Sequence, residues 1–175
     1  MHKLFLILTL VFVSGLIGCG ESEPKESRKR LPIVRKRVKW LNSYEAAVTK
    51  SRETGKPIFA FFTGSDWCKY CSLMDEQILN TATFANWSKE NVVLLELDFP
   101  RNKQLEEPIA RQNEELKNKY RISGFPTVLF LMPDGTPVLQ AGYHKVTPEQ
   151  WIEVVEKKLK ESLGNQTSQP SETQN

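Results

Sequence analysis

The sequence predicts an α/β fold in which a mixed β-sheet lies between layers of helices. Two patterns support this prediction: short apolar runs alternate with helical segments early in the chain, and a hairpin turn joins the last two strands. Length and composition agree with it. The chain has 175 residues, of which 39% are hydrophobic and 26% are charged, as expected for one soluble globular domain.

The predicted elements follow one another as helix, strand, helix, strand, helix, strand, strand and helix. Their expected ranges are 44–54, 57–62, 68–79, 92–97, 104–120, 127–132, 137–141 and 148–163. Ser43 is the expected cap of the first helix, and Gly55 is its expected end. The second helix follows a turn at 63–66, and the third is mostly polar. Thr147 caps the last helix, with Pro148 in its first position.

The strands are predicted from unbroken apolar runs, which are typical of strands buried on both faces. The first reads Pro-Ile-Phe-Ala-Phe-Phe over residues 57–62, and the pair Asp134-Gly135 marks the hairpin between the last two. Most aromatic side chains are interpreted as core or packing residues rather than as a ligand site. These are Trp40, Tyr44, Phe59, Phe61, Phe62, Trp87, Phe130 and Trp151.

The first 18 residues are predicted to be a signal peptide. Their apolar run of about fifteen residues is shorter than the ~20 that a membrane-spanning helix needs. The run ends in Leu-Ile-Gly-Cys at 16–19, which resembles the lipobox of bacterial lipoproteins. The resemblance implies cleavage before Cys19 and acylation of its thiol, which would anchor the chain at a membrane. The alternative is a plain signal peptide with an incidental cysteine.

Export would place the domain in a compartment where disulfides persist. We therefore expect a membrane-anchored lipoprotein that faces the periplasm or the cell exterior. Gly20 follows Cys19, and the acidic residue that the resembled sorting pattern uses for inner-membrane retention is absent there, which favours the outer membrane. With Cys19 acylated, two of the three cysteines remain as thiols.

Residues 19–39 are interpreted as the lipidated cysteine followed by a flexible, basic tether. Within 20–39 there are eight basic and three acidic side chains, which either solvate the tether or attract it to anionic lipid headgroups. The folded domain is expected over 40–163. Residues 164–175 contain no large apolar side chain and are expected to be disordered. Residues 40–175 hold 15 basic and 18 acidic side chains, so the sequence gives no electrostatic indication of a nucleic-acid partner.

The candidate chemistry lies in two cysteines three residues apart, Cys68 and Cys71, at a predicted strand-to-helix turn. At a helix N-terminus the first thiol faces unpaired backbone N–H groups and the positive end of the helix dipole, and both favour the thiolate. Lys69 adds a cation that would lower the pKa of Cys68 further. Cys71, one turn into the helix, would be shielded and would resolve a mixed disulfide. The spacing therefore indicates thiol–disulfide exchange without a bound cofactor.

Three motifs resemble the thioredoxin superfamily over residues 40–163. They are Trp67-Cys68-Lys69-Tyr70-Cys71 after a buried strand, Gly124-Phe125-Pro126-Thr127 before another, and the closing hairpin with Gly135 and Gly142. The wider phrase 62–68 is similar to exported bacterial thioredoxin-like proteins and to the C-terminal domain of the transmembrane thiol–disulfide interchange proteins. The resemblance implies that Cys68 and Cys71 are catalytic.

The same resemblance implies a cis peptide bond before Pro126, which would lie against the cysteines. Trp67, Phe125 and Thr127 would complete a substrate-binding surface with Pro126. The inner dipeptide, Lys69 and Tyr70, would tune the reduction potential. The implied partners are exported proteins with cysteines and a membrane or soluble thiol–disulfide donor, in addition to the bilayer held by Cys19. The direction of electron flow stays open.

The chain also departs from the family pattern. Thioredoxins carry a buried aspartate on the strand before the motif, and the matching position here is Phe61 or Phe62. The stretch 98–115 is longer than the loop and helix of thioredoxin. We expect a longer helix there, and the alternative is a surface shaped for a partner.

The cysteine pair also has three other interpretations. A zinc or copper site is disfavoured because one pair supplies two ligands and His144, the histidine outside the signal peptide, is expected at the surface. A purely structural disulfide is disfavoured because so small a ring contributes little chain entropy. A non-catalytic binding module of the same fold remains an alternative that activity decides.

Overall fold

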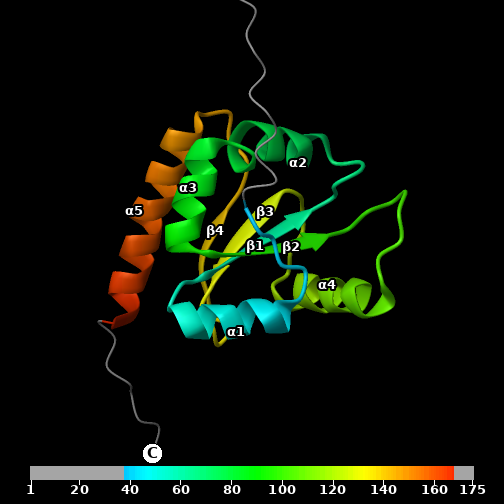
Figure 1. Cartoon of the computed structure of the whole chain (residues 1–175), viewed down its shortest axis with the longest axis horizontal. Coiled ribbons are helices and arrows are strands. Elements are labelled where there is room, and N and C mark those ends of the chain that lie inside the picture. Colours follow the sequence, from blue (N-terminus) through cyan, green and yellow to red (C-terminus); the bar gives the residue numbers. More distant parts are fainter. Residues whose placement is uncertain (1–37, 168–175) are drawn as a thin grey trace, which may run out of the picture. The chain divides into compact units, whose positions relative to one another are not determined.

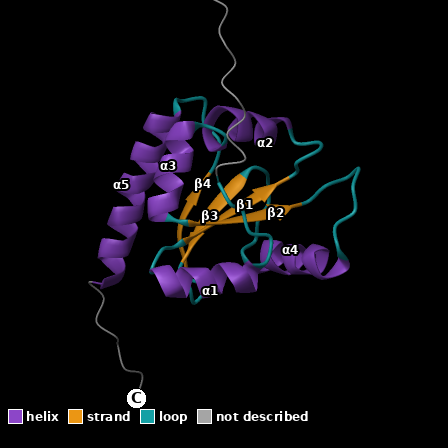
Figure 2. Ribbon diagram, viewed as in Figure 1, coloured by secondary structure: helices purple, strands orange, loops and turns teal. Residues whose placement is uncertain are grey.

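The computed structural model describes residues 38–167, and they form a four-stranded sheet with helices on both faces (Figures 1 and 2). The predicted signal peptide, Cys19 and the predicted tether up to residue 37 lie outside the described residues. No helix within 38–167 combines the length and apolar character needed to cross a membrane. The elements are α1 (Tyr44–Thr54), β1 (Ile58–Thr63), α2 (Lys69–Met74), the π-helical turn η2 (Asp75–Leu79), α3 (Ala82–Asn91), β2 (Val93–Asp98), α4 (Glu107–Lys119), β3 (Thr127–Leu131), β4 (Pro137–Ala141) and α5 (Pro148–Thr167).

The sheet is mixed, as the sequence predicts, with strand order β2-β1-β3-β4. β1 and β2 run parallel, whereas β3 is antiparallel to both β1 and β4. The parallel register ends at the pair Thr63 and Asp98, so the chain leaves both strands at the same edge of the sheet. Phe62 pairs with Thr127 across the antiparallel ladder. The turn after β1 and the loops after β2 and before β3 are therefore neighbours.

Alternating side chains of β1 enter two separate apolar cores, because successive residues of a strand point to opposite faces. Phe59 and Phe61 face the helices α2, α3 and α5, together with Trp151. Ile58, Ala60 and Phe62 face α1 and α4. Figure 1 shows this division, with α1 and α4 on one side of the sheet and the other helices across it. The predicted core aromatics Phe59, Phe61, Phe62, Phe130 and Trp151 are all buried.

Local capping signals identified most elements correctly. Ser43 Oγ accepts a hydrogen bond from Ala46 N at 3.3 Å, and Gly55 ends α1 with a positive φ of 70°. The hairpin turn contains Gly135 at φ 87°, and the amide N–H of Thr136 donates to Asp134 at 2.8 Å. Leu41, just before α1, forms an isolated bridge to Leu95 and covers part of the β2 edge.

The sequence prediction missed α3. Its side chains are mostly polar or weak helix formers, so the periodic apolar signal is faint. The helix forms because Thr81 caps it, accepting a hydrogen bond from Phe84 N at 3.2 Å, and because Phe84, Ala85 and Ser88 are buried against the core. The expected helix 68–79 is present, but it changes from α2 to the π-helical turn η2 at Asp75.

Two further expectations were wrong in part. The third predicted helix begins at Glu107 rather than at residue 104, so 99–106 form a loop and the stretch 98–115 is not simply a longer helix. Pro108 lies in the first turn of α4, where proline is tolerated. The loop before it is held by Asp66 and Asp98. The last helix runs to Thr167, past the expected start of the disordered tail, and residues 168–175 lie outside the described residues.

Candidate active site

Cys68 and Cys71 are joined by a disulfide at the N-terminus of α2. Cys68 is the N-cap residue of this helix, and its Sγ accepts a hydrogen bond from the amide N–H of Cys71 at 3.2 Å. The exposed fraction is 7% for Cys68 and 1% for Cys71. The first sulfur therefore lies at the positive end of a helix and is the more accessible of the two. This geometry suits Cys68 as the nucleophile and Cys71 as the resolving thiol.

The loop before β3 contains a cis peptide bond between Phe125 and Pro126, which confirms the sequence prediction. Thr127 fixes this loop, because its Oγ1 donates to the carbonyl of Gly124 at 2.8 Å. Since Thr127 pairs with Phe62 on β1, the cis-proline loop lies beside the turn that leads to Cys68. Phe125 and Pro126 are half-buried and Thr127 is buried.

Trp67 lies at the centre of contacts with three neighbouring segments. Its ring nitrogen donates to the carbonyl of Phe99 at 2.7 Å, and its ring meets Phe125 edge-on with centroids 5.8 Å apart. A Cβ added to Gly64 would lie 2.5 Å from the indole, so the glycine permits the close approach. The guanidinium of Arg101 lies 3.9 Å from the ring centroid. Trp67 is still 37% exposed, and it joins Phe125 in one aromatic surface beside Cys68.

Lys69 and Tyr70, the two residues between the cysteines, both point toward solvent. Tyr70 is 61% exposed, and its ring lies 6.3 Å from the ring of Tyr143 in a tilted arrangement. The hydroxyl of Tyr143 donates to Gln77 Oε1 at 2.8 Å. Tyr143 and Gln77 were not anticipated from the sequence, because each contributes through a neighbour more than sixty residues away.

The family's buried aspartate is replaced by apolar side chains, since Phe61 and Phe62 are both buried. The buried acid near the site is instead Asp98, at the end of β2. Its carboxylate accepts hydrogen bonds from Ser65 N at 2.9 Å and from Ser65 Oγ at 2.7 Å, and it pairs with Lys103 Nζ at 2.8 Å. The hydrogen bond that Lys103 Nζ donates to Asp98 is the main cause that raises the pKa of Lys103. An aspartate that closes an apolar strand was the signal that could have indicated this role.

Asp66 holds the loop after β2 from the other side. Its carboxylate oxygens accept hydrogen bonds from Arg101 N at 3.0 Å and from Asn102 N at 2.7 Å. These backbone donors, with Arg101 first, lower the pKa of Asp66. Asp66 therefore positions the loop after β2.

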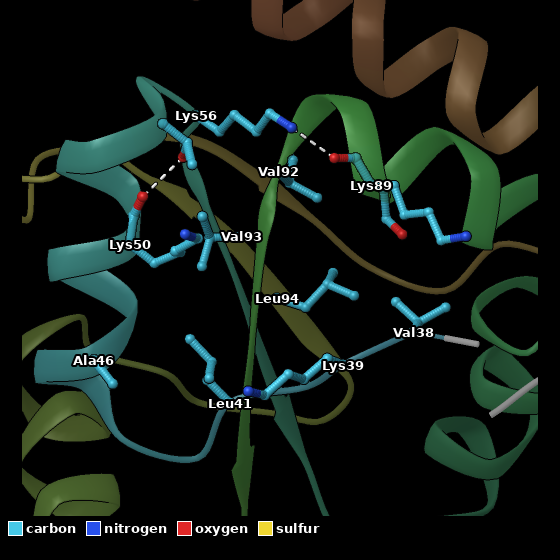
Figure 3. Close-up of a pocket in the computed structure, with 12 residues that line it drawn as sticks. Val38, Lys39, Leu41, Ala46, Lys50, Lys56, Lys89, Val92, Val93 and Leu94 are labelled. Atoms are coloured by element: carbon cyan, nitrogen blue, oxygen red, sulfur yellow. Dashed lines mark hydrogen bonds between the residues drawn. The ribbon is translucent and has the colours of Figure 1, made fainter. Parts of the chain in front are cut away.

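The hollows on the described surface include two of similar size. One of about 440 Å³ lies beside β2, where four lysines, Lys39, Lys50, Lys56 and Lys89, surround an apolar floor (Figure 3). None of its lining residues belongs to the cysteine motif or to the cis-proline loop. The other, of about 400 Å³, lies between β4 and α5 and includes Pro126 and Thr127. His144 lines this second hollow and is exposed, as predicted.

Comparison with known proteins agrees with this geometry. The model of the thioredoxin-like domain family matches residues 44–159. The chain is 33% identical over 155 residues to the disulfide bond reductase DsbH of Chlamydia pneumoniae, covering 89% of this chain and 91% of that protein. It is 27% identical over 142 residues to the thioredoxin-related protein DsbJ of the same organism, covering 81% of this chain but 38% of that protein.

Solved structures give the same result. A DsbH oxidoreductase structure matches with a TM-score of 0.68 and 31% identity, covering 81% of this chain and 95% of that one. A thioredoxin from Thermus thermophilus, at 18% identity and a TM-score of 0.52, shares the fold, and it covers 69% of this chain and 85% of that one. With the cysteine pair placed at the start of α2 and the cis-proline beside it, the chain is a thiol–disulfide oxidoreductase and belongs to the thioredoxin-like family.

Proposed function

We propose that this chain is an exported, membrane-tethered oxidoreductase that reduces disulfides in other exported proteins through Cys68 and Cys71. The observation that carries the proposal is the placement of the two cysteines: the accessible Cys68 caps α2 and the shielded Cys71 lies behind it. The direction toward reduction is supported by the relative named a disulfide bond reductase, which is 33% identical over most of both chains.

The reaction follows from this arrangement in two balanced steps. In the reduced chain, the Cys68 thiolate attacks one sulfur of the client disulfide, and the other client sulfur leaves as a thiolate. Cys71 then loses its proton and attacks Cys68 Sγ, which releases the second client thiolate and leaves the Cys68–Cys71 disulfide. The client gains two electrons and the chain loses two. A dithiol protein of the membrane or of the exported compartment must return them before the next turnover.

The surface around Cys68 suits an extended client segment. Trp67 and Phe125 form an aromatic wall on one side, and the loop that contains cis-Pro126 would offer its backbone to the client segment. The hollow between β4 and α5 begins at Pro126 and Thr127, so it offers room for client side chains farther from the cysteine. Lys69 and Tyr70 are exposed and would tune the potential and contact the client.

The proposed location depends on Cys19, which lies outside the described residues. If its thiol is acylated, a tether of about twenty residues spans about 25 Å as a random coil, which keeps the domain close to its membrane. Cys19→Ser in the full-length chain is expected to move the protein from the membrane fraction to the soluble fraction of cells. Unchanged membrane association would contradict the lipid anchor without affecting the redox proposal.

The test of the redox proposal is the reduction potential of the cysteine pair, measured by titration in glutathione buffers with Trp67 fluorescence as the signal. A value near that of thioredoxin, about −270 mV, supports a reductant, and a value near −120 mV would instead indicate an oxidant. The same chain should catalyse insulin reduction, and Cys68→Ser should abolish it. Cys71→Ser should accumulate mixed disulfides on a non-reducing gel. Absence of any redox-linked signal would favour a non-catalytic binding module.

A further inference from the structure

The loop after β2 places a cation directly on the aromatic wall of the active site. The guanidinium carbon of Arg101 lies 3.9 Å from the centroid of the Trp67 ring, within the range of a cation–π contact. The position is set by the backbone, because the amide N–H groups of Arg101 and Asn102 both donate to the carboxylate of Asp66. Trp67 directly precedes Cys68, so this cation lies on the ring of the residue next to the proposed nucleophile.

The acidic side chains around Cys68 have partners within the protein, whereas the basic side chains Arg101 and Lys69 do not pair with a described carboxylate. The Asp66 carboxylate binds the loop amides, and the Asp98 carboxylate binds Ser65 and pairs with Lys103. Arg101 and Lys69 are exposed, and within residues 38–167 no carboxylate pairs with either of these side chains. The carboxylates of Asp66 and Asp98 are thus engaged by groups of the protein itself, whereas the side chains of Arg101 and Lys69 face the solvent.

We propose that Arg101 is a specificity-determining residue that favours clients with a carboxylate next to the target cysteine. A guanidinium stacked on an indole keeps its N–H edges available, and these edges match a carboxylate in a bidentate arrangement. The client's acidic side chain would bind Arg101 while its disulfide meets Cys68, and Lys69 would add a less directional attraction. This inference rests on the proposed disulfide exchange and names the substrate class for it.

The first test compares disulfide-linked peptides that differ in charge alone. Three peptides carry Glu, Gln or Lys on both sides of the cysteine, and the second-order rate constant of their reduction by the full-length chain is followed by Trp67 fluorescence. The Glu peptide is expected to react about five- to tenfold faster than the Gln peptide, and the Lys peptide slower than both. The advantage should shrink as the salt concentration rises, because exposed charges are screened.

The second test assigns the preference to one side chain. Arg101→Gln should bring the Glu and Gln peptides to equal rates, and Arg101→Lys should keep part of the difference, because lysine lacks the planar fork. Arg111→Gln is the matched control, since Arg111 is an exposed arginine of α4 that pairs with Glu107 at 3.6 Å. It should leave the ratio unchanged. The readout is the ratio of the rate constants for the Glu and Gln peptides. A displaced Trp67 would slow all peptides alike and would leave this ratio unchanged.

Several outcomes would overturn the inference. These are equal rates for the Glu and Gln peptides in the unmodified chain, an unchanged ratio in Arg101→Gln, or an equal slowing of every peptide. Oxidised glutathione and its ester test a small-molecule source of the same carboxylate chemistry, and a preference confined to glutathione would also overturn the protein-client assignment. In all these cases the proposed function stands as long as the unmodified chain reduces the Gln peptide. If no peptide is reduced, the proposed function itself fails.

Discussion

Trp67 and Tyr70 flank Cys68 in the sequence, and the protein holds them in different ways. Trp67 is 37% exposed and is fixed by a hydrogen bond to the Phe99 carbonyl, by Phe125, by Gly64 and by Arg101. Tyr70 is 61% exposed, and the centroid of its ring lies 6.3 Å from that of the Tyr143 ring. Both are aromatic and both are at the surface, yet one is enclosed by three segments and the other meets one.

The difference indicates a division of tasks within the site. The Trp67 side is positioned through main-chain groups and through the carboxylates of Asp66 and Asp98, so its shape is set before a client arrives. The Tyr70 side is held through side chains alone, by the ring of Tyr143 and its hydrogen bond to Gln77, so we expect it to adapt to the bound segment. Selection of clients would then occur at Trp67 and Arg101, and accommodation of varied sequences at Tyr70.

The strongest test of the fixed side is Gly64→Ala. The added Cβ would lie 2.5 Å from the indole, so Trp67 has to leave its position and lose its contacts with Phe99 and Phe125. We expect a loss of about 3 kcal/mol in the free energy of unfolding, measured by chemical denaturation, together with altered Trp fluorescence. Gly124→Ala is the control, because nothing lies within 4 Å of a Cβ at that position. Equal stability of both variants would show that Trp67 is not held as described.

A smaller loss is expected from Asp98→Asn. The amide cannot accept both hydrogen bonds from Ser65 and pair with Lys103 as the carboxylate does. The expected cost is about 1–2 kcal/mol in unfolding free energy, with faster hydrogen exchange of the amides in 99–106. Glu107→Gln removes an exposed pair with Arg111 and should change the stability by less than about 0.5 kcal/mol. If the amides of 99–106 exchange no faster in Asp98→Asn than in the unmodified chain, then Asp98 does not hold this loop.

Tyr143→Phe tests the adaptable side and should have a small effect. It removes one hydrogen bond, from the Tyr143 hydroxyl to Gln77, at an exposed position. We expect a loss of at most about 0.5–1 kcal/mol and nearly unchanged rates with peptide substrates. A large fall in rate would mean that the Tyr70 side is also pre-set, and the contrast between the two sides would be lost.

The smallest expected effect is a pH dependence of the loop contact at Asp66. Its pKa lies below the ordinary 3.8 in the folded chain, mainly because Arg101 N and Asn102 N donate to the charged carboxylate. The contact therefore stabilises the fold above about pH 4 and is lost as the pH falls through the lower folded-state value. The stability difference between the unmodified chain and Asp66→Asn should shrink below pH 4, while amide exchange at 101 and 102 rises.

Asp134→Asn provides the comparison for that titration. Asp134 also has a lowered pKa, because Thr136 donates to it, but it belongs to the hairpin turn between β3 and β4. Acid should weaken the hairpin contact in the same pH range without changing exchange at 101 and 102. If both variants alter the loop equally, then global unfolding rather than the Asp66 contact explains the pH effect.

Features encoded by neighbouring residues were predicted well from the sequence. Ser43 with Gly55, the Asp134-Gly135 turn and the cis bond before Pro126 each depend on a few adjacent residues or on a motif with a fixed meaning. The cysteine pair was likewise placed at a helix N-terminus, because a buried strand and a turn precede it. Such local features can be predicted without knowledge of the tertiary structure.

Features that depend on distant partners were not predictable in the same way. α3 forms through burial of Phe84 and Ala85, although its own sequence favours a helix weakly. The loop 99–106 bends at residues 101–103, where Asp66 accepts hydrogen bonds from the amides of Arg101 and Asn102 and Asp98 pairs with Lys103. The residues near position 100 carry no local signal for a contact with Asp66, which is more than thirty positions away. The helix expected there was consequently too long.

The bridge at Leu41 has a consequence for the sheet itself. β2 is an outer strand, and the amide of Leu41 donates to Leu94 while its carbonyl accepts from Glu96 N at 2.8 Å. This short pairing occupies edge groups that would otherwise be a template for strands of other chains. A shortened chain that begins after Leu41 would expose that edge, and its tendency to self-associate should rise even though every residue of the active site is retained.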